Sequence, residues 1–184
     1  MANVYQIYNL KRKIADHIGI EKANHFIPDE YLNGDNKTAK QKAQIMNAIL
    51  EKMDYELDIS VIKNIRRNTS CNITKNQMEI IDCSKNKTNI QVEQCEIINA
   101  GIAPSKIEML GNKYIFRFGY GKCICRMFSK IENPKSFRSF CYCCAGNIEK
   151  LLGYWLEKTI EVELENSHLL GNKDCVFGSI NEET

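Results

Sequence analysis

Hydrophobic residues in the first 68 positions recur about every three to four residues, which is the spacing of one face of an α-helix. The positions that carry this pattern are Val4, Ile7, Tyr8, Ile14 and Ile18, followed by Ile45, Ile49, Leu50 and Met53. The polar stretch 32–37 separates the two groups and is typical of a loop. Two more helices are predicted over 74–83 and 89–100, and the second is expected to end near Gly101, with Pro104 just beyond.

From residue 105 onward the pattern changes to the alternation that is typical of β-strands. Residues 105–110 and 113–118 predict a hairpin with its turn at 111–112. A further strand is predicted over 122–128, and the polar sequence 133–135 interrupts the chain.

The clearest helix is predicted over 144–158, followed by strands at 160–165 and 175–180. Its apolar face consists of Ile148, Leu151, Leu152 and Trp155. These elements predict an α/β fold of the α+β type, with N-terminal helices and an antiparallel sheet of hairpins against which the C-terminal helix packs. We expect one compact unit overall, made of a helical N-terminal extension over 1–70 and a cysteine-rich α/β domain over 71–184.

The charge balance narrows the range of partners. Lys and Arg total 25 against 23 Asp and Glu, a formal charge of +2, and no basic stripe alternates with aromatic residues. Nucleic acid is therefore not an expected partner. The first 17 residues lack the apolar core of a secretory signal, and no apolar run is long enough to span a bilayer. A soluble, cytoplasmic protein without membrane association is the expectation.

The chain contains nine cysteines, an odd number that argues against a closed disulfide framework. In a reducing cytosol they are expected as thiols or metal ligands. Six of the nine lie in the last 62 residues, namely Cys123, Cys125, Cys141, Cys143, Cys144 and Cys175. The scattered Cys71, Cys83 and Cys95 are interpreted as ordinary buried thiols.

Two pairs of cysteines have one residue between them. Cys123 and Cys125 lie on a predicted strand, so their thiols should project from one face. A two-residue turn at 120–121 would place them on the same side as Phe116 and Phe118, whereas a three-residue turn would reverse that facing. The facing therefore depends on the turn.

The second pair, Cys141 and Cys143, leads directly into the predicted helix. A helix N-terminus favours the thiolate, which is the form that binds metals and attacks carbon. Both pairs, Cys123 with Cys125 and Cys141 with Cys143, together with Glu165, His168 and Cys175 are suited to a tetrahedral zinc site. The alternative is that all of them are buried thiols.

Three other features each have two interpretations. His168 is either a metal ligand or acid–base group, or an inert histidine in a loop between strands. The glutamates of 161–165 are most simply a solvated strand face. Phe140, Tyr142 and Trp155 either line a pocket or pack in the core.

Several motifs of the last 66 residues form an ordered set. They are Lys122-Cys123-x-Cys125, Cys141-Tyr142-Cys143-x-Ala145-Gly146, Leu152-Gly153, Val162-Glu163-Leu164-Glu165 and Gly171-x-x-x-Cys175-x-Phe177. This set resembles a group of bacterial and archaeal proteins of anaerobes, some of them identified as L-2-amino-thiazoline-4-carboxylic acid hydrolases. The C-terminal half also resembles the 4-vinyl-reductase-type small-molecule-binding domain, whose fold is shared by transport-particle subunits and the haem nitric-oxide-binding family.

The resemblance implies a zinc site near the closing hairpin. In phenol-sensing relatives, cysteines and a glutamate hold the metal, which here implies Cys141 or Cys143, Glu165 and Cys175. Where those sensors have a further cysteine, this chain has His168, and histidine is also a zinc ligand. The pair at 123–125 belongs to the thiazoline-hydrolase-like pattern instead. The fold class also implies a homodimer.

Three hypotheses for function follow. The first is a sensor-like module that binds a small apolar or thiazoline-like molecule, with a structural zinc held by the C-terminal cysteines. The second is a hydrolase of a thiazoline-like molecule, with Cys143 or Cys144 as nucleophile and His168 as the nearest base, or with a metal-activated water. The third is an interaction protein with reduced, metal-free cysteines in its core.

Overall fold

The computed structural model describes residues 4–33, 37–125, 131 and 137–180. The chain divides into two compact units. Unit 1 consists of residues 1–70 and 124–143, and unit 2 of residues 71–123 and 144–184. The segment 124–143, which the sequence-based division assigns to the second domain, is therefore part of unit 1.

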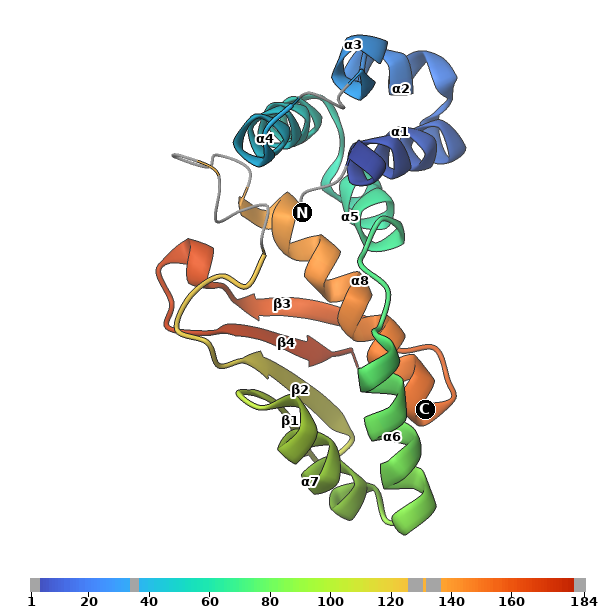
Figure 1. Cartoon of the computed structure of the whole chain (residues 1–184), viewed down its shortest axis with the longest axis vertical. Helices are drawn as coiled ribbons and strands as arrows, with labels where there is room; N and C mark the ends of the chain where they lie inside the picture. Colours follow the sequence, from blue (N-terminus) through green and yellow to red (C-terminus); the bar gives the residue numbers. More distant parts are fainter. Residues whose placement is uncertain (1–3, 34–36, 126–130, 132–136, 181–184) are drawn as a thin grey trace. The chain divides into compact units, whose positions relative to one another are not determined.

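Unit 1 is helical in its described part (Figure 1). Its first five helices are α1 (Val4–Ile18), α2 (Ile20–Phe26), α3 (Asp29–Leu32), α4 (Ala39–Glu56) and α5 (Ile59–Asn68). The first seven residues of α8 (Phe137–Leu156) complete it. Of the apolar positions predicted from the sequence, Ile7, Ile14, Ile49, Leu50 and Met53 are buried in its core, whereas Tyr8 is 57% exposed. Leu10, which the prediction did not include, is also fully buried.

Unit 2 combines helices with a four-stranded antiparallel sheet in the order β1-β2-β4-β3 (Figure 1). The strands are β1 (Ser105–Leu110), β2 (Lys113–Phe118), β3 (Val162–Asn166) and β4 (Cys175–Ser179). The helices are α6 (Lys75–Lys87), α7 (Gln91–Ile102) and the remainder of α8, and the short helix η2 (His168–Leu170) precedes β4. The predicted α+β class is thus confirmed.

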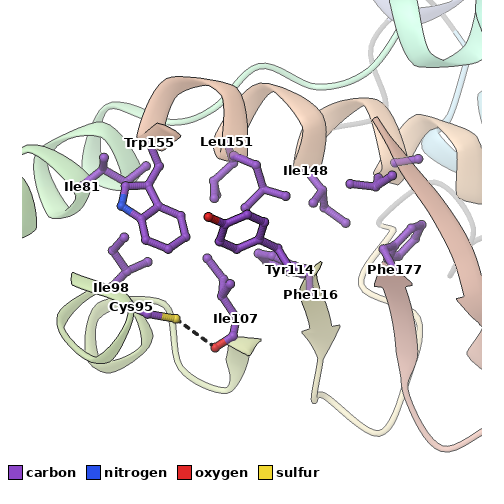
Figure 2. Close-up of a cluster of buried hydrophobic side chains, with 13 residues drawn as sticks. Ile81, Cys95, Ile98, Ile107, Tyr114, Phe116, Ile148, Leu151, Trp155 and Phe177 are labelled. Atoms are coloured by element: carbon purple, nitrogen blue, oxygen red, sulfur yellow. Dashed lines mark hydrogen bonds between the residues drawn. The ribbon is translucent and has the colours of Figure 1, made fainter. Parts of the chain in front are cut away.

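One face of the sheet, which we term the inner face, packs against the helices. Figure 2 shows Ile148, Leu151 and Trp155 of α8 pointing toward the side chains of β2 and β4. The core of unit 2 comprises Ile81, Cys95, Ile98, Ile107, Tyr114, Phe116, Ala145, Ile148, Leu151, Leu152, Trp155, Val162 and Phe177. Trp155, Phe140 and Tyr142 are each at most 4% exposed, which favours core packing over a pocket for these three residues.

The outer face of the sheet carries charged side chains. Lys113 of β2 and Glu165 of β3 form an ion pair of 2.6 Å that passes over Gly178 of β4. A Cβ atom at Gly178 would overlap both side chains, so glycine makes room for this pair. Hydrogen bonds from Lys106 and Arg117 lower the pKa of Glu108 on the same face.

Two predicted elements differ in the structure. The predicted hairpin of 105–110 and 113–118 is confirmed. Of the strand predicted over 122–128, residues 122–125 form no strand and 126–128 lie outside the described residues. The predicted break at 133–135 also lies outside the described residues. Helix α8 begins at Phe137, seven residues before the predicted start at Cys144. No helix in the described part of the chain is long and apolar enough to cross a membrane.

Candidate functional site

The early start of α8 changes the interpretation of Cys141, Cys143 and Cys144. All three lie inside the helix, at least four residues beyond its first residue, Phe137. Residues two apart on a helix point to nearly opposite sides, so Cys141 and Cys143 do not share a face. The predicted activation of these thiols by a helix N-terminus is wrong, because the unpaired N–H groups belong to the first turn.

The structure also differs from the prediction for the other closely spaced pair, Cys123 and Cys125. Cys123 and Cys125 belong to no strand, so the prediction that strand alternation aligns them on one face is wrong. The division between the units falls between them, since Cys123 belongs to unit 2 and Cys125 to unit 1.

Glu165 and Cys175 lie on opposite faces of the sheet. A bulge in β3 between Leu164 and Asn166 contains Glu165, whose carboxylate is paired with Lys113 on the outer face. Cys175 lies in register with Phe118 and packs against the inner-face core. The two residues therefore do not point toward a common metal ion.

The predicted zinc site stays a prediction. No group of three or more His, Cys, Asp or Glu side chains that could hold a metal ion occurs among the residues described. The predicted ligand set is split between unit 1 and unit 2. Its members are Cys125, Cys141 and Cys143 in the first, and Cys123, Glu165, His168 and Cys175 in the second.

The structure does bring Cys175 and His168 together, at one end of the inner face. The backbone N–H of His168 donates to Cys175 Sγ over 3.3 Å, and the imidazole Nδ1 is a buried atom without a hydrogen-bond partner in the described part of the chain. Cys144, Phe118 and Leu164 are partly buried and pack against the same core. We call Phe118, Cys144, Leu164, His168 and Cys175 the Phe118 end.

Aromatic rings connect this end to the interior. Phe118 makes edge-to-face contacts with Phe116 at 4.9 Å and with Phe177 at 6.0 Å between ring centroids. Phe116 and Phe177 are at most 3% exposed, whereas Phe118 is partly exposed. An apolar molecule that covers Phe118 would extend the buried core and would meet the thiol of Cys175, which lies in register with Phe118.

At the opposite end of the inner face, hydrogen bonds hold Trp155 and Tyr114. Trp155 Nε1 donates to Gln94 Oε1 over 2.8 Å, and the hydroxyl of Tyr114 donates to Gln91 Oε1 over 3.1 Å. The two rings also meet edge to face at 5.7 Å. Trp155 is 2% and Tyr114 8% exposed, whereas their neighbours Met109, Leu156 and Ile160 are partly buried, as Phe118 and Leu164 are.

The three scattered cysteines differ from one another. Cys95 is 6% exposed and donates its S–H to the carbonyl of Ile107 over 3.2 Å, as expected for a buried thiol (Figure 2). The same expectation is wrong for Cys71 and Cys83, which are exposed. Burial raises the pKa of Cys95 above its ordinary value of 9.0, which stabilises the thiol form.

The raised pKa of Cys95 predicts alkaline destabilisation. Above pH 9 the unfolded chain releases this proton while the folded chain retains it, so the free energy of unfolding should fall as pH rises toward the folded pKa. Urea unfolding from pH 7 to 10 should show a smaller loss in Cys95→Ala than in the native chain. The exposed Cys83→Ala variant is the control, and equal pH slopes for the two variants would contradict the prediction.

The sequence did not predict Phe118 and Leu164 as site residues. Both belong to strands with clear alternation, at 113–118 and 160–165, and both lie on the apolar side of that alternation. That pattern was sufficient to place them on the inner face. It gave no indication that they lie where the helical cover ends.

The whole chain matches a single family. The model of the family of unknown function DUF6144 matches residues 5–184, so the chain belongs to this family. No curated protein matches the chain.

Solved structures of low similarity include H-NOX proteins. The crystal structure of an H-NOX protein from S. oneidensis in the Fe(II) ligation state is 15% identical over 97% of both chains, with a TM-score of 0.46. The NMR structure of an H-NOX domain from Shewanella oneidensis in the Fe(II)CO ligation state is 11% identical, covering 97% of this chain and 98% of that one, with a TM-score of 0.42. Because these TM-scores lie below 0.5, the proposals below rest on the residues of this chain alone.

Proposed function

We propose that unit 2 is a small-molecule-binding module whose ligand covers the Phe118 end. The observation that carries this proposal is the partly exposed ring of Phe118, which packs on the buried rings of Phe116 and Phe177. Leu164, Cys144 and Cys175 at the same end are also only partly buried. Covering such apolar surface is favourable in proportion to its area.

The ligand that fits this surface is small and largely apolar. The ring of Phe118 is the partly exposed member of a ring cluster with Phe116 and Phe177, and the neighbouring Cys175 accepts a hydrogen bond from the backbone N–H of His168. A few polar groups in a mainly apolar site are typical of ligand sites. A thiazoline-like ligand and a homodimer, which the resemblance implies, remain predictions.

Zinc binding and hydrolysis receive less support from the geometry. Glu165 is paired with Lys113 on the face of the sheet opposite Cys175. Cys143 and Cys144 lie inside α8 and lack the activating helix N-terminus. We therefore propose binding without a zinc-dependent or cysteine-dependent reaction step.

The apolar dye 1-anilinonaphthalene-8-sulfonate tests the proposal. It should bind the folded protein saturably with one dye per chain, and its emission should rise as that of Trp155, the chain's one tryptophan, falls by energy transfer. Cys175→Leu, which fills the site, should weaken binding at least about tenfold, because a bulkier side chain occupies the ligand's space. Leu110→Ser, at an exposed position of the same sheet, should leave the affinity unchanged.

Circular dichroism in the near ultraviolet provides the folding control, since partly folded proteins also bind this dye. Retained affinity in Cys175→Leu, with a native spectrum, would contradict the location of the site. Absence of saturable binding to the native protein would contradict the proposal itself.

A further inference from the structure

The buried face of α5 in unit 1 contains an arginine. Ile62, Ile65 and Arg66 are the buried residues of this helix, and their spacing is that of one apolar stripe. Arg66 is 5% exposed. A charged side chain at such a position is costly unless an opposite charge accompanies it.

The partners of Arg66 in unit 1 are neutral. Its Nε donates to the carbonyl of Ser139 over 2.9 Å, and its Nη1 donates to Thr69 Oγ1 over 3.2 Å. No carboxylate of the residues that the structure describes lies within the 4.0 Å of an ion pair with it. The nearby Asp54 instead accepts a hydrogen bond from the hydroxyl of Ser139.

Lys11, the other buried cation of the described chain, provides an internal comparison. Lys11 is 9% exposed, and its ammonium group is paired with Asp29 at 2.6 Å. Arg66 is more deeply buried and has two hydrogen bonds to neutral oxygens. The carbonyl groups at the end of α5 offset part of its charge, and two of the five guanidinium N–H groups have an acceptor among the described residues.

We propose that Arg66 binds a small oxyanion, a carboxylate or a phosphate, that completes its buried guanidinium. The planar fork of a guanidinium matches two oxygens of such an anion in a bidentate arrangement. This site belongs to unit 1 and does not depend on the function proposed for unit 2.

The test observes the Nε–H of Arg66 by nitrogen-edited NMR of the intact protein. This proton is held by the Ser139 carbonyl and is assigned by its disappearance in Arg66→Lys. Inorganic phosphate and acetate are titrated separately, with sodium chloride added to keep the ionic strength constant. The expected result is a saturable shift of this signal with at least one of the two anions.

Matched variants show whether the response depends on Arg66. Phosphate should raise the midpoint of thermal unfolding of the native chain and of Lys11→Met, but not of Arg66→Met, in which an apolar side chain of similar length replaces the cation. A saturable shift with phosphate alone assigns a phosphate site, and one with acetate alone assigns a carboxylate site. The absence of any saturable shift of the Arg66 signal, or an equal shift with chloride alone, would overturn the proposal even if Arg66→Met failed to fold.

Discussion

Replacing Phe177 by alanine is expected to lower the free energy of unfolding of unit 2 by about 3–5 kcal/mol. Phe177 is 1% exposed and lies on β4, which has a neighbouring strand on each side. Its ring packs with Phe118 at 6.0 Å and against the α8 side chains shown in Figure 2. Truncation removes this contact area and leaves a cavity, because the two flanking strands prevent the site from collapsing.

Urea unfolding followed by Trp155 emission measures this effect, because this tryptophan lies in the same core. Phe177→Leu keeps most of the side-chain volume and should cost less than about 1.5 kcal/mol. Leu110→Ala, at a position 63% exposed, should change the free energy of unfolding by less than about 0.5 kcal/mol. A loss below about 1 kcal/mol in Phe177→Ala would contradict the central position of Phe177 in the core.

The hairpin of β1 and β2 could be predicted in full because its signals are local. The alternation over 105–118 assigns each side chain to a face, and Gly111, with φ of 60°, forms the turn. The same alternation predicted the strand at 160–165, which the structure places at Val162–Asn166. Local pattern and turn chemistry are sufficient where a strand pairs with its neighbour in sequence.

The strand predicted at 122–128 shows where local pattern is insufficient. The open side of β2 is occupied by β4, which comes last in the chain, so residues 122–125 do not pair there. Which distant segment pairs with β2 depends on packing over the whole of unit 2. Alternation of apolar residues makes a segment suitable for a strand without providing it with a partner.

The start of α8 was missed for a related reason. Residues 137–143 are rich in aromatic residues, cysteine and serine, all of which have lower helix propensity than alanine or leucine. Ser139, Phe140 and Tyr142 are nevertheless buried in unit 1. Burial in the tertiary structure stabilises these first two turns despite the weak propensity, and it moves Cys141 and Cys143 into the helix.

The candidate site was predicted only in part. Cys175 and His168 were identified from the sequence and lie together, because the short connection through η2 returns the chain to β4. Glu165 was assigned to the same site by the family resemblance. Alternation with the inward-facing Leu164 places Glu165 on the outer face, where it pairs with Lys113.

Replacing Asn99 by leucine is expected to lower the free energy of unfolding of unit 2 by about 1–3 kcal/mol. Asn99 of α7 lies beside β1, an edge strand, and binds both backbone groups of Ile107. Its Oδ1 accepts from the Ile107 N–H over 2.7 Å, and its Nδ2 donates to the Ile107 carbonyl over 2.8 Å. In Asn99→Leu the Ile107 carbonyl still accepts a hydrogen bond from the S–H of Cys95. The main loss is therefore that the Ile107 N–H no longer has an acceptor.

The Asn99→Asp variant separates these two hydrogen bonds by pH. An introduced carboxylate still accepts from the N–H but faces the carbonyl oxygen of Ile107, so its folded pKa should rise above the ordinary value of about 3.9. A group with a raised folded pKa loses its contribution to stability as pH rises through that pKa. Asn99→Asp should therefore approach native stability near pH 4 and fall below it at pH 7.

Urea unfolding at pH 4, 5, 6 and 7, with the native chain measured at each pH, follows this dependence. Asn112→Asp, in the exposed turn between β1 and β2, provides a matched control for the added charge. The same pH dependence in both variants would show that net charge, and not the contact with Ile107, causes the loss. A loss confined to Asn99→Asp would establish that one side chain of α7 pairs with the open edge of the sheet and thereby protects it from pairing with other chains.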